Sequence, residues 1–294
     1  MKSFVQHTVC PLLAALIWGI AFSAQSVCAE YMEPFTLNAI RGGVAFVLLL
    51  LFCLLRKNRS VGAKKDLVLG SLLCGISMFL ATNIQQFGLG ETSAGKAGFI
   101  TALYIVIVPM TGIFFRKKVP VKVWLAVAIA VAGMYFLCIT EQFTIARGDL
   151  MVVICAFFFA AQILCIDHFV QKVDGIALSC GQFLVVAVLS SLCMAATETP
   201  TVAGITACIW PLLYVAVFSS CVAYTLQIIA QKGANPAVVS LLLSMESVFA
   251  VLGGAVLLHE RLSGRELLGC VLMMAAVILA ELPEKKAVRK ASPE

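Results

Sequence analysis

The chain has 294 residues, of which 62% are apolar and only 12% are charged, and its mean hydropathy is +1.03. Soluble proteins average about 45–50% apolar and about 25% charged residues, so this composition excludes a soluble globular domain and indicates an integral membrane protein. The net charge of +6 would also suit a nucleic-acid-binding protein, and the positions of the basic residues decide between the two interpretations.

Ten apolar segments long enough to cross a membrane follow one another along the chain. A transmembrane helix needs about 20 apolar residues, and a helix is required because lipid offers the backbone no hydrogen-bond partner. The loops between the segments are short, so neighbouring helices are expected to be antiparallel. We predict an all-α integral membrane protein with transmembrane helices at residues 8–28, 34–55, 67–87, 92–115, 121–140, 149–170, 176–196, 207–231, 235–258 and 264–282.

The first segment has an alternative interpretation as a secretory signal. Lys2, the apolar run and Val27-Cys28-Ala29 follow the order of a basic start, an apolar core and a cleavage site. The run is long for a signal core, and its removal would leave nine crossings and put one basic terminus on the wrong side. We therefore interpret this segment as a transmembrane helix.

Basic residues gather on one face of the predicted bundle. The positive-inside rule then places both termini in the cytoplasm and the protein in the cell (inner) membrane. Because the basic residues are divided among several short loops and a short tail, we exclude a nucleic-acid partner. The basic face holds Lys2, Arg56, Lys57, Arg59, Lys64, Lys65, Arg116, Lys117, Lys118, Lys122, Lys172, Lys232, Lys285, Lys286, Arg289 and Lys290, and the other face holds Lys96, Arg147, Arg261 and Arg265.

The two halves of the chain share a pattern. A shift of 143 residues lays Thr92-Ser93-Ala94 over Asn235-Pro236-Ala237, and a shift of 141 lays Asn38 and Arg41 over Ser179 and Gln182. A repeat of five helices has an odd number of crossings, so the two copies must have opposite orientations, as in many transporters. We predict a first repeat at residues 1–143, a second at 144–283, and a basic cytoplasmic tail at 284–294.

With these features the sequence resembles the drug/metabolite transporter superfamily, in its ten-helix EamA family. The resemblance implies a carrier of small metabolites or drugs, usually an exporter, with helices 5 and 10 bracing a cavity formed by the others. Ser247 stands where the family usually has proline, and Lys117 replaces a common acidic residue. The matching residues are Trp18-Gly19, Arg41, Gly88-Leu89, Thr92-Ser93-Ala94-Gly95-Lys96-Ala97, Phe99-Ile100-Thr101, Leu103-Tyr104, Val108-Pro109, Gly148-Asp149, Glu246, Val248-Phe249-Ala250, His259-Glu260-Arg261-Leu262 and Gly269.

Two ionisable residues fall inside predicted helices, where such groups are costly and suggest function. Glu246, in the middle of its segment, is a candidate proton-coupling or amine-binding group, and the alternative is a hydrogen-bonded structural glutamate. Arg41 follows Asn38 at i+3 and could hold a substrate carboxylate through its planar guanidinium, or could bond helix carbonyls instead. If both face one cavity, they suit a zwitterion such as an amino acid.

Polar and aromatic side chains on several segments complete the predicted substrate site. Amides inside a helical bundle bind either a ligand or one another, and the sequence leaves both roles open for each of these residues. Their presence on segments of both halves favours a wet central cavity. These candidates are Trp18, Asn83, Gln86, Tyr104, Gln162, Gln182, Tyr224 and Gln227.

Enzyme and cofactor signatures are weak. Gly90 to Ala97 nearly spells a phosphate-binding loop, but Ala97 lacks the hydroxyl that holds magnesium and no strand precedes it. His259-Glu260 has no second histidine at zinc-site spacing. We predict a transporter that is not an enzyme and needs no cofactor, with a small solute, the lipid bilayer and, as a candidate coupling ion, the proton as partners. A lipid-modifying membrane enzyme and a passive channel are the alternatives, and the oligomeric state stays open.

Overall fold

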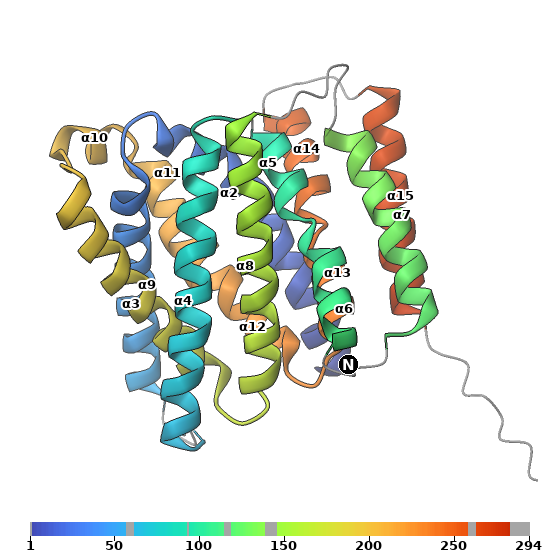
Figure 1. Ribbon diagram of the computed structural model, residues 1–294, viewed down its shortest axis with the longest axis horizontal. Coiled ribbons are helices and arrows are strands. Elements are labelled where there is room, and N and C mark those ends of the chain that lie inside the picture. Colours follow the sequence, from blue (N-terminus) through green and yellow to red (C-terminus); the bar gives the residue numbers. More distant parts are fainter. Residues whose placement is uncertain are drawn as a thin grey trace, which may run out of the picture.

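The computed structural model describes residues 2–56, 62–92, 94–114, 119–138, 146–257 and 263–282, and within these ranges the chain is helical apart from turns and one isolated bridge between Gly62 and Val173. Figure 1 shows the helices packed side by side in a bundle. They are α1 (Lys2–Phe4), η1 (Val5–Val9), α2 (Cys10–Ala29), α3 (Pro34–Leu55), α4 (Lys64–Leu89), α5 (Ala94–Thr101), α6 (Tyr104–Phe114), α7 (Val121–Cys138), α8 (Arg147–Phe169), α9 (Gly175–Thr197), α10 (Val202–Ala207), α11 (Ile209–Leu213), η2 (Tyr214–Ala223), α12 (Tyr224–Gln231), α13 (Pro236–Leu243), α14 (Glu246–Leu257) and α15 (Gly264–Glu281).

Six helical stretches of the described chain are long and apolar enough to cross a membrane by themselves. The apolar helices over 97–113, 121–136 and 236–252 are shorter, and α15 carries Arg265, Glu266 and Glu281 near its ends. The structure therefore supports an all-helical, multi-pass membrane protein, whereas the count of ten crossings stays a prediction. The six long spans are Val5–Ala29, Pro34–Leu55, Lys64–Leu89, Arg147–Phe169, Gly175–Thr197 and Ile209–Gln231.

Two predicted helices are interrupted midway. The segment 92–115 is divided into α5 and α6 by a turn at Ala102 and Leu103, and the segment 235–258 is divided into α13 and α14 by a turn at Ser244 and Met245. Ser244 Oγ donates to the carbonyl of Leu241 at 2.7 Å, one of the side-chain bonds that bend helices. The second interruption therefore forms although Ser247 replaces the proline of the resembling family.

The interruptions occur at equivalent places in the two halves. Helix α5 begins at Ala94 and α13 at Pro236, and α6 begins at Tyr104 and α14 at Glu246, an offset of 142 residues in both cases. The offset is 143 for the starts of α7 and α15, and 141 for those of α3 and α9. For the interrupted helices the structural offset is thus one residue less than the sequence shift of 143.

Neighbouring helices come close where glycine permits it. A Cβ atom on Gly148 in α8 would lie 2.8 Å from the carbonyl oxygen of Gly88 in α4, and one on Gly133 in α7 would lie 3.0 Å from that of Gly269 in α15. Such close backbone contact is typical of helices packed in a membrane. Figure 1 shows α7 and α15 together at one end of the bundle.

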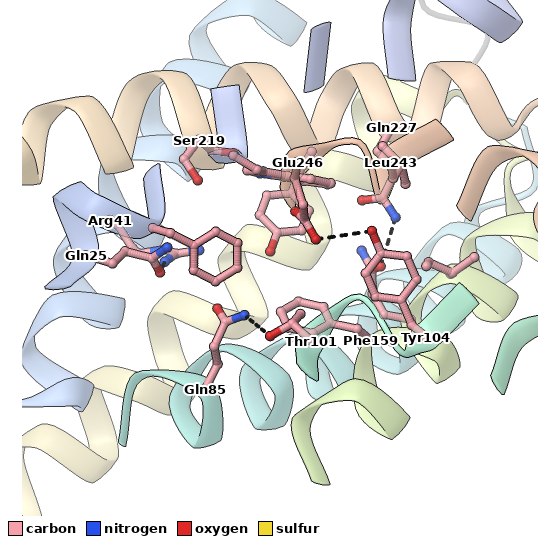
Figure 2. A pocket seen from close by; sticks show the side chains of 15 residues that line it. Gln25, Arg41, Gln85, Thr101, Tyr104, Phe159, Ser219, Gln227, Leu243 and Glu246 are labelled. Atoms are coloured by element: carbon pink, nitrogen blue, oxygen red, sulfur yellow. Dashed lines mark hydrogen bonds between the residues drawn. The ribbon is translucent and has the colours of Figure 1, made fainter. Parts of the chain in front are cut away.

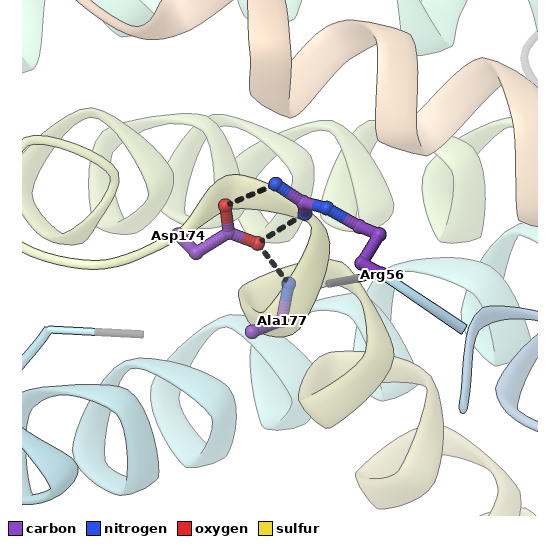
Figure 3. Close-up of polar contacts among 3 residues, drawn as sticks. All are labelled: Arg56, Asp174 and Ala177. Carbon is purple, nitrogen blue, oxygen red and sulfur yellow. Dashed lines mark hydrogen bonds and ion pairs between the residues drawn. The ribbon is translucent and has the colours of Figure 1, made fainter. Parts of the chain in front are cut away.

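Helices α3 and α9 are fastened to each other at both ends. At one end Arg56 Nη1 and Nη2 donate to Asp174 Oδ1 and Oδ2 at 3.0 and 3.3 Å, and Asp174 also caps α9 by accepting from the Ala177 backbone N–H (Figure 3). At the other end Glu198 accepts from the backbone N–H groups of Phe35 and Thr36, at 2.9 and 2.6 Å. Carboxylates at helix N-termini satisfy free N–H groups and the helix dipole.

The start and the end of the described chain lie on the same face of the bundle. Thr8 Oγ1 donates to Glu281 Oε2 at 3.3 Å, and Figure 1 shows the end of α15 on the side of the bundle where the N-terminus lies. Several predicted features lie outside the described residues, namely Lys57, Arg59, Ser93, Arg116, Lys117, Lys118, His259, Glu260, Arg261, Leu262 and the tail 284–294. The side chain of Lys96 is also outside them.

Candidate functional site

A polar cavity lies in the centre of the bundle (Figure 2), and it contains about 460 Å³ of empty space. The lining side chains come from both halves of the chain. They are Trp18, Phe22, Gln25, Arg41, Gln85, Thr101, Tyr104, Phe159, Gln162, Ile163, Ser219, Tyr224, Gln227, Leu243 and Glu246.

The structure brings seven of the ten predicted site residues to this cavity. They are Trp18, Arg41, Tyr104, Gln162, Tyr224, Gln227 and Glu246. The other three, Asn83, Gln86 and Gln182, are buried but do not line it. Placement alone leaves the roles of all ten as predictions.

Arg41 occupies one side of the cavity. It lies in α3 and is only 2% exposed, and its Nη1 donates to Gln25 Oε1 of α2 at 2.8 Å. Figure 2 shows Arg41 and Gln25 together, away from Glu246. Gln25 is a neutral partner, so the positive charge is hydrogen-bonded but not neutralised by it.

Glu246 occupies another side, at the start of α14. The hydroxyl of Tyr104, at the start of α6, donates to Glu246 Oε1 at 3.3 Å. The two residues are thus the equivalent first residues of the two helices that follow the interruptions. Within the described chain the ion pairs are Arg56–Asp174 and Lys172–Asp66, so Arg41 and Glu246 line one cavity without pairing to each other.

An aromatic wall runs beside these two groups. The ring centroids of Trp18 and Tyr224 are 4.6 Å apart, and those of Tyr224 and Phe183 are 5.7 Å apart. Trp18 Nε1 donates to the carbonyl of Ser219, which lies in η2. A π-helical turn of this kind places side chains irregularly and is frequent at functional sites.

Three glutamines from three helices form a hydrogen-bonded chain next to the cavity. Gln227 Nε2 donates to Gln162 Oε1 at 3.2 Å, and Gln162 Nε2 donates to Gln182 Oε1 at 3.3 Å. Gln227 Oε1 and Gln182 Nε2, at the two ends, are buried and have no partner in the described structure. Gln227 therefore offers a free acceptor where it lines the cavity.

Asn83 and Gln86 bond other helices instead of facing the cavity. Asn83 accepts from Asn38 at 3.0 Å and donates to Ser190 Oγ at 3.3 Å. Gln86 Nε2 donates to the backbone carbonyl of Gln25 at 3.1 Å. These are the helix-to-helix contacts that were the alternative interpretation of both residues.

Eight lining residues were not among the sequence candidates. Gln85 is one of them, and its Nε2 donates to Thr101 Oγ1 at 3.0 Å. Thr101 and Phe22 carry no ionisable group, but Thr101 lies in the block that resembles the EamA family, which was a usable signal. The eight are Phe22, Gln25, Gln85, Thr101, Phe159, Ile163, Ser219 and Leu243.

The described residues contain no group of three His, Cys, Asp or Glu side chains placed to hold a metal ion. The groups that line the cavity are a guanidinium, a carboxyl group, amides, hydroxyls and aromatic faces.

Comparison with known proteins gives relatives of one kind. The EamA-like transporter family matches residues 9–139 and again residues 146–282. A protein of Archaeoglobus fulgidus described as an uncharacterized transporter is 33% identical over 271 residues, which cover 92% of this chain and 84% of that protein. Another, from Methanothermobacter thermautotrophicus, is 24% identical and covers 91% of this chain and 84% of that protein.

A solved structure shares the fold. A protein known from its crystal structure superposes with a TM-score of 0.79 and 18% sequence identity, over 94% of this chain and 96% of that chain. At this identity the likeness concerns the arrangement of the helices alone.

Proposed function

The chain belongs to the EamA-like transporter family, and from this membership we propose that it is a secondary transporter of small amino-acid-like metabolites or drugs, acting as an exporter. The coarser conclusion, a multi-pass membrane transporter of a small molecule, follows from the family and the apolar helices. The finer one rests on a single observation. Arg41 and Glu246, of opposite charge type, line the same cavity without forming an ion pair.

This arrangement suits a zwitterionic solute. The guanidinium of Arg41 presents planar donors that match a carboxylate, and the carboxyl group of Glu246 with the free Gln227 Oε1 presents acceptors for an ammonium group. The face of Trp18 offers an apolar contact for the rest of the solute. Unpaired charges in a membrane interior are costly, so a ligand that pairs with both would bind with a net gain.

The mechanism we propose is alternating access by two inverted repeats, residues 1–143 and 144–283, of five transmembrane helices each. The double family match and the equivalent interruptions of the helices at 92–115 and 235–258 support this division. Interrupted helices at the repeat interface are typical places for substrate and ion sites in transporters. The Tyr104–Glu246 hydrogen bond joins the two repeats there, and we propose that it breaks and re-forms as the cavity changes sides.

The driving force we propose is a proton carried by Glu246, with both termini in the cytoplasm. Glu246 is 4% exposed and accepts a hydrogen bond from the neutral Tyr104 hydroxyl, so a proton or a cationic solute is needed to neutralise its charge. Exchange and facilitated diffusion are the alternatives to proton coupling.

The experiment is solute flux in proteoliposomes. A thermal-shift screen of the purified chain against amino acids, nucleosides, sugars and cations first selects the solute, since a ligand that binds the folded state raises its melting temperature. We expect counterflow when the liposomes are preloaded with an amino-acid-like solute. We also expect a pH gradient to drive flux of this solute in the wild type and not in Glu246→Gln. Glu30→Gln, which changes an exposed carboxylate, is the matched control and should retain driven flux.

Three outcomes would contradict parts of the proposal. Unchanged pH-driven flux in Glu246→Gln would remove the proton role. Flux that neither saturates nor shows counterflow would indicate a channel, and turnover of a lipid by the purified protein would indicate an enzyme.

A further inference from the structure

A groove opens on the outer surface of the bundle between α3 and α4. The two helices follow each other in the chain and both pack against α9, whose side chains form the floor of the groove. Helices α9 and α4 approach closely at Gly181, where a Cβ atom would lie 1.9 Å from Ser71 Oγ of α4. This α3–α4 groove contains about 810 Å³ of empty space and is lined by Phe46, Cys53, Leu67, Val68, Ser71, Leu72, Ala177, Cys180, Gly181, Leu184 and Val185.

The groove continues into a hollow that ends at two lysines. This second hollow, with about 670 Å³ of empty space, is lined by Lys64, Lys65, Val68, Leu69 and Leu72, so it shares Val68 and Leu72 with the groove. Lys64, Val68 and Leu72 are spaced by four residues and lie on one side of α4. An apolar path therefore leads directly to two exposed ammonium groups at the end of the helix.

The charges around this end leave Lys64 and Lys65 available. Asp174 is held by Arg56 (Figure 3), and Asp66 Oδ1 lies 3.9 Å from Lys172 Nζ. Among the described residues no carboxylate pairs with Lys64 or Lys65. The chain between α3 and α4 adds Lys57 and Arg59 in sequence, and no acidic residue, to the same connection.

We propose that the α3–α4 groove binds one acyl chain of an anionic glycerophospholipid whose phosphate lies against Lys64 and Lys65. The eight helical steps from Lys64 to Leu72 rise about 12 Å, and one leaflet of the hydrocarbon layer is about 15 Å thick, so the groove matches the depth of a single leaflet. A lipid with a net negative headgroup is attracted by the two lysines, whereas the cation of a zwitterionic headgroup is repelled.

This lipid site goes beyond the proposed transport function and does not depend on it. The groove is on the surface that faces lipid, and none of its lining residues belongs to the central cavity. Failure of the lipid proposal would leave the solute site untouched, and the reverse also holds.

The first test removes the charges. The purified full chain is equilibrated with phosphatidylglycerol or phosphatidylcholine in detergent micelles, and retained lipid is counted by native mass spectrometry. We expect one phosphatidylglycerol to be retained in preference to phosphatidylcholine, and we expect Lys64→Gln/Lys65→Gln to reduce this preference about 25-fold, since each lysine near an anionic surface contributes a factor of about five. Lys232→Gln, an exposed lysine outside the groove, should leave the preference unchanged.

The second test fills the groove. Leu184 lies on its floor and is 42% exposed, so Leu184→Trp should displace the acyl chain and abolish retention of phosphatidylglycerol. Leu192→Trp introduces the same side chain at a 63% exposed position of α9 outside the groove and should retain the lipid. Equal retention of the two lipids by the wild type, or equal retention by the two tryptophan variants, would overturn the proposal.

Discussion

At the scale of single residues, the cavity keeps two ionisable groups apart from each other. Arg41 and Glu246 have neutral partners, Gln25 and Tyr104, at 2.8 and 3.3 Å. A neutral hydrogen bond orients a charged group but compensates only part of the cost of its burial. If a solute supplies the missing charges, as proposed above, its binding would offset the remaining cost.

Asn83 and Gln227 distinguish the structural amides from those of the cavity. Asn83→Leu removes the bonds to Asn38 and Ser190 and should lower the free energy of unfolding by about 1 kcal/mol, at about 0.6 kcal/mol per interhelical bond, with KM for the solute unchanged. Gln227→Leu removes a cavity acceptor and should raise KM about tenfold. Melting temperatures and solute flux in proteoliposomes measure both effects. A raised KM in Asn83→Leu would move Asn83 into the binding site.

The neighbours Gln85 and Gln86 show how far sequence predicts the site. Consecutive residues of a helix point about 100° apart, and the sequence gives the polar positions of α4 but not the rotation of the helix about its axis. Gln86 was the predicted candidate, whereas Gln85 lines the cavity and Gln86 bonds the backbone of Gln25. The sequence indicated Arg41 and Glu246 because an ionisable group inside a membrane-spanning segment is costly, and both line the cavity.

At the scale of helices, apolar length predicted where helices lie but not where they are interrupted. The turn at Ala102 and Leu103 has no glycine or proline, and η2 has a sequence that any apolar helix could carry. Tertiary contacts select such local geometry, and the spacing of apolar residues along the chain carries no information about these contacts. The start of α15, by contrast, can be read from the sequence, because Ser263 and Glu266 have the spacing of a capping box and form one.

The interruption between α13 and α14 predicts an unequal response to proline. Ser247→Pro should fold and transport, with a loss of about 1 kcal/mol, because residue 247 follows the turn and its N–H makes only one 3.2 Å bond to the Ser244 carbonyl. Ser240→Pro places the same change inside α13 and should cost about 3 kcal/mol. Both serines are buried, so the comparison is matched. Melting temperature and flux measure it, and equal losses would show that the helix is effectively continuous at Ser247.

At the scale of the whole molecule, several helices of the second half begin at a nearly constant offset from helices of the first half. The offset between equivalent helix starts is 141 residues for α3 and α9, 142 for the interrupted helices and 143 for α7 and α15. It therefore changes by one residue from one of these pairs to the next. Tyr104 and Glu246 are equivalent in this comparison, and they hydrogen-bond to each other. Equivalent residues of two halves related by a two-fold axis meet only near that axis. If the halves are inverted repeats, as proposed above, the axis lies in the membrane plane and this contact lies near the bilayer midplane.

Two inverted repeats of five crossings each predict that both chain ends lie in the same compartment, whereas a single repeat would place its ends on opposite sides of the membrane. Ten crossings, as predicted, would return the chain to the side where it began, and the basic loops predict that this side is the cytoplasm. Green fluorescent protein fused to either end should therefore fluoresce, and alkaline phosphatase inserted between Glu198 and Thr201 should be active outside. The 3.3 Å bond from Thr8 to Glu281 already requires both ends on one face. Reporters that place the ends in different compartments would exclude an even number of crossings, and with it the two inverted halves around Tyr104 and Glu246.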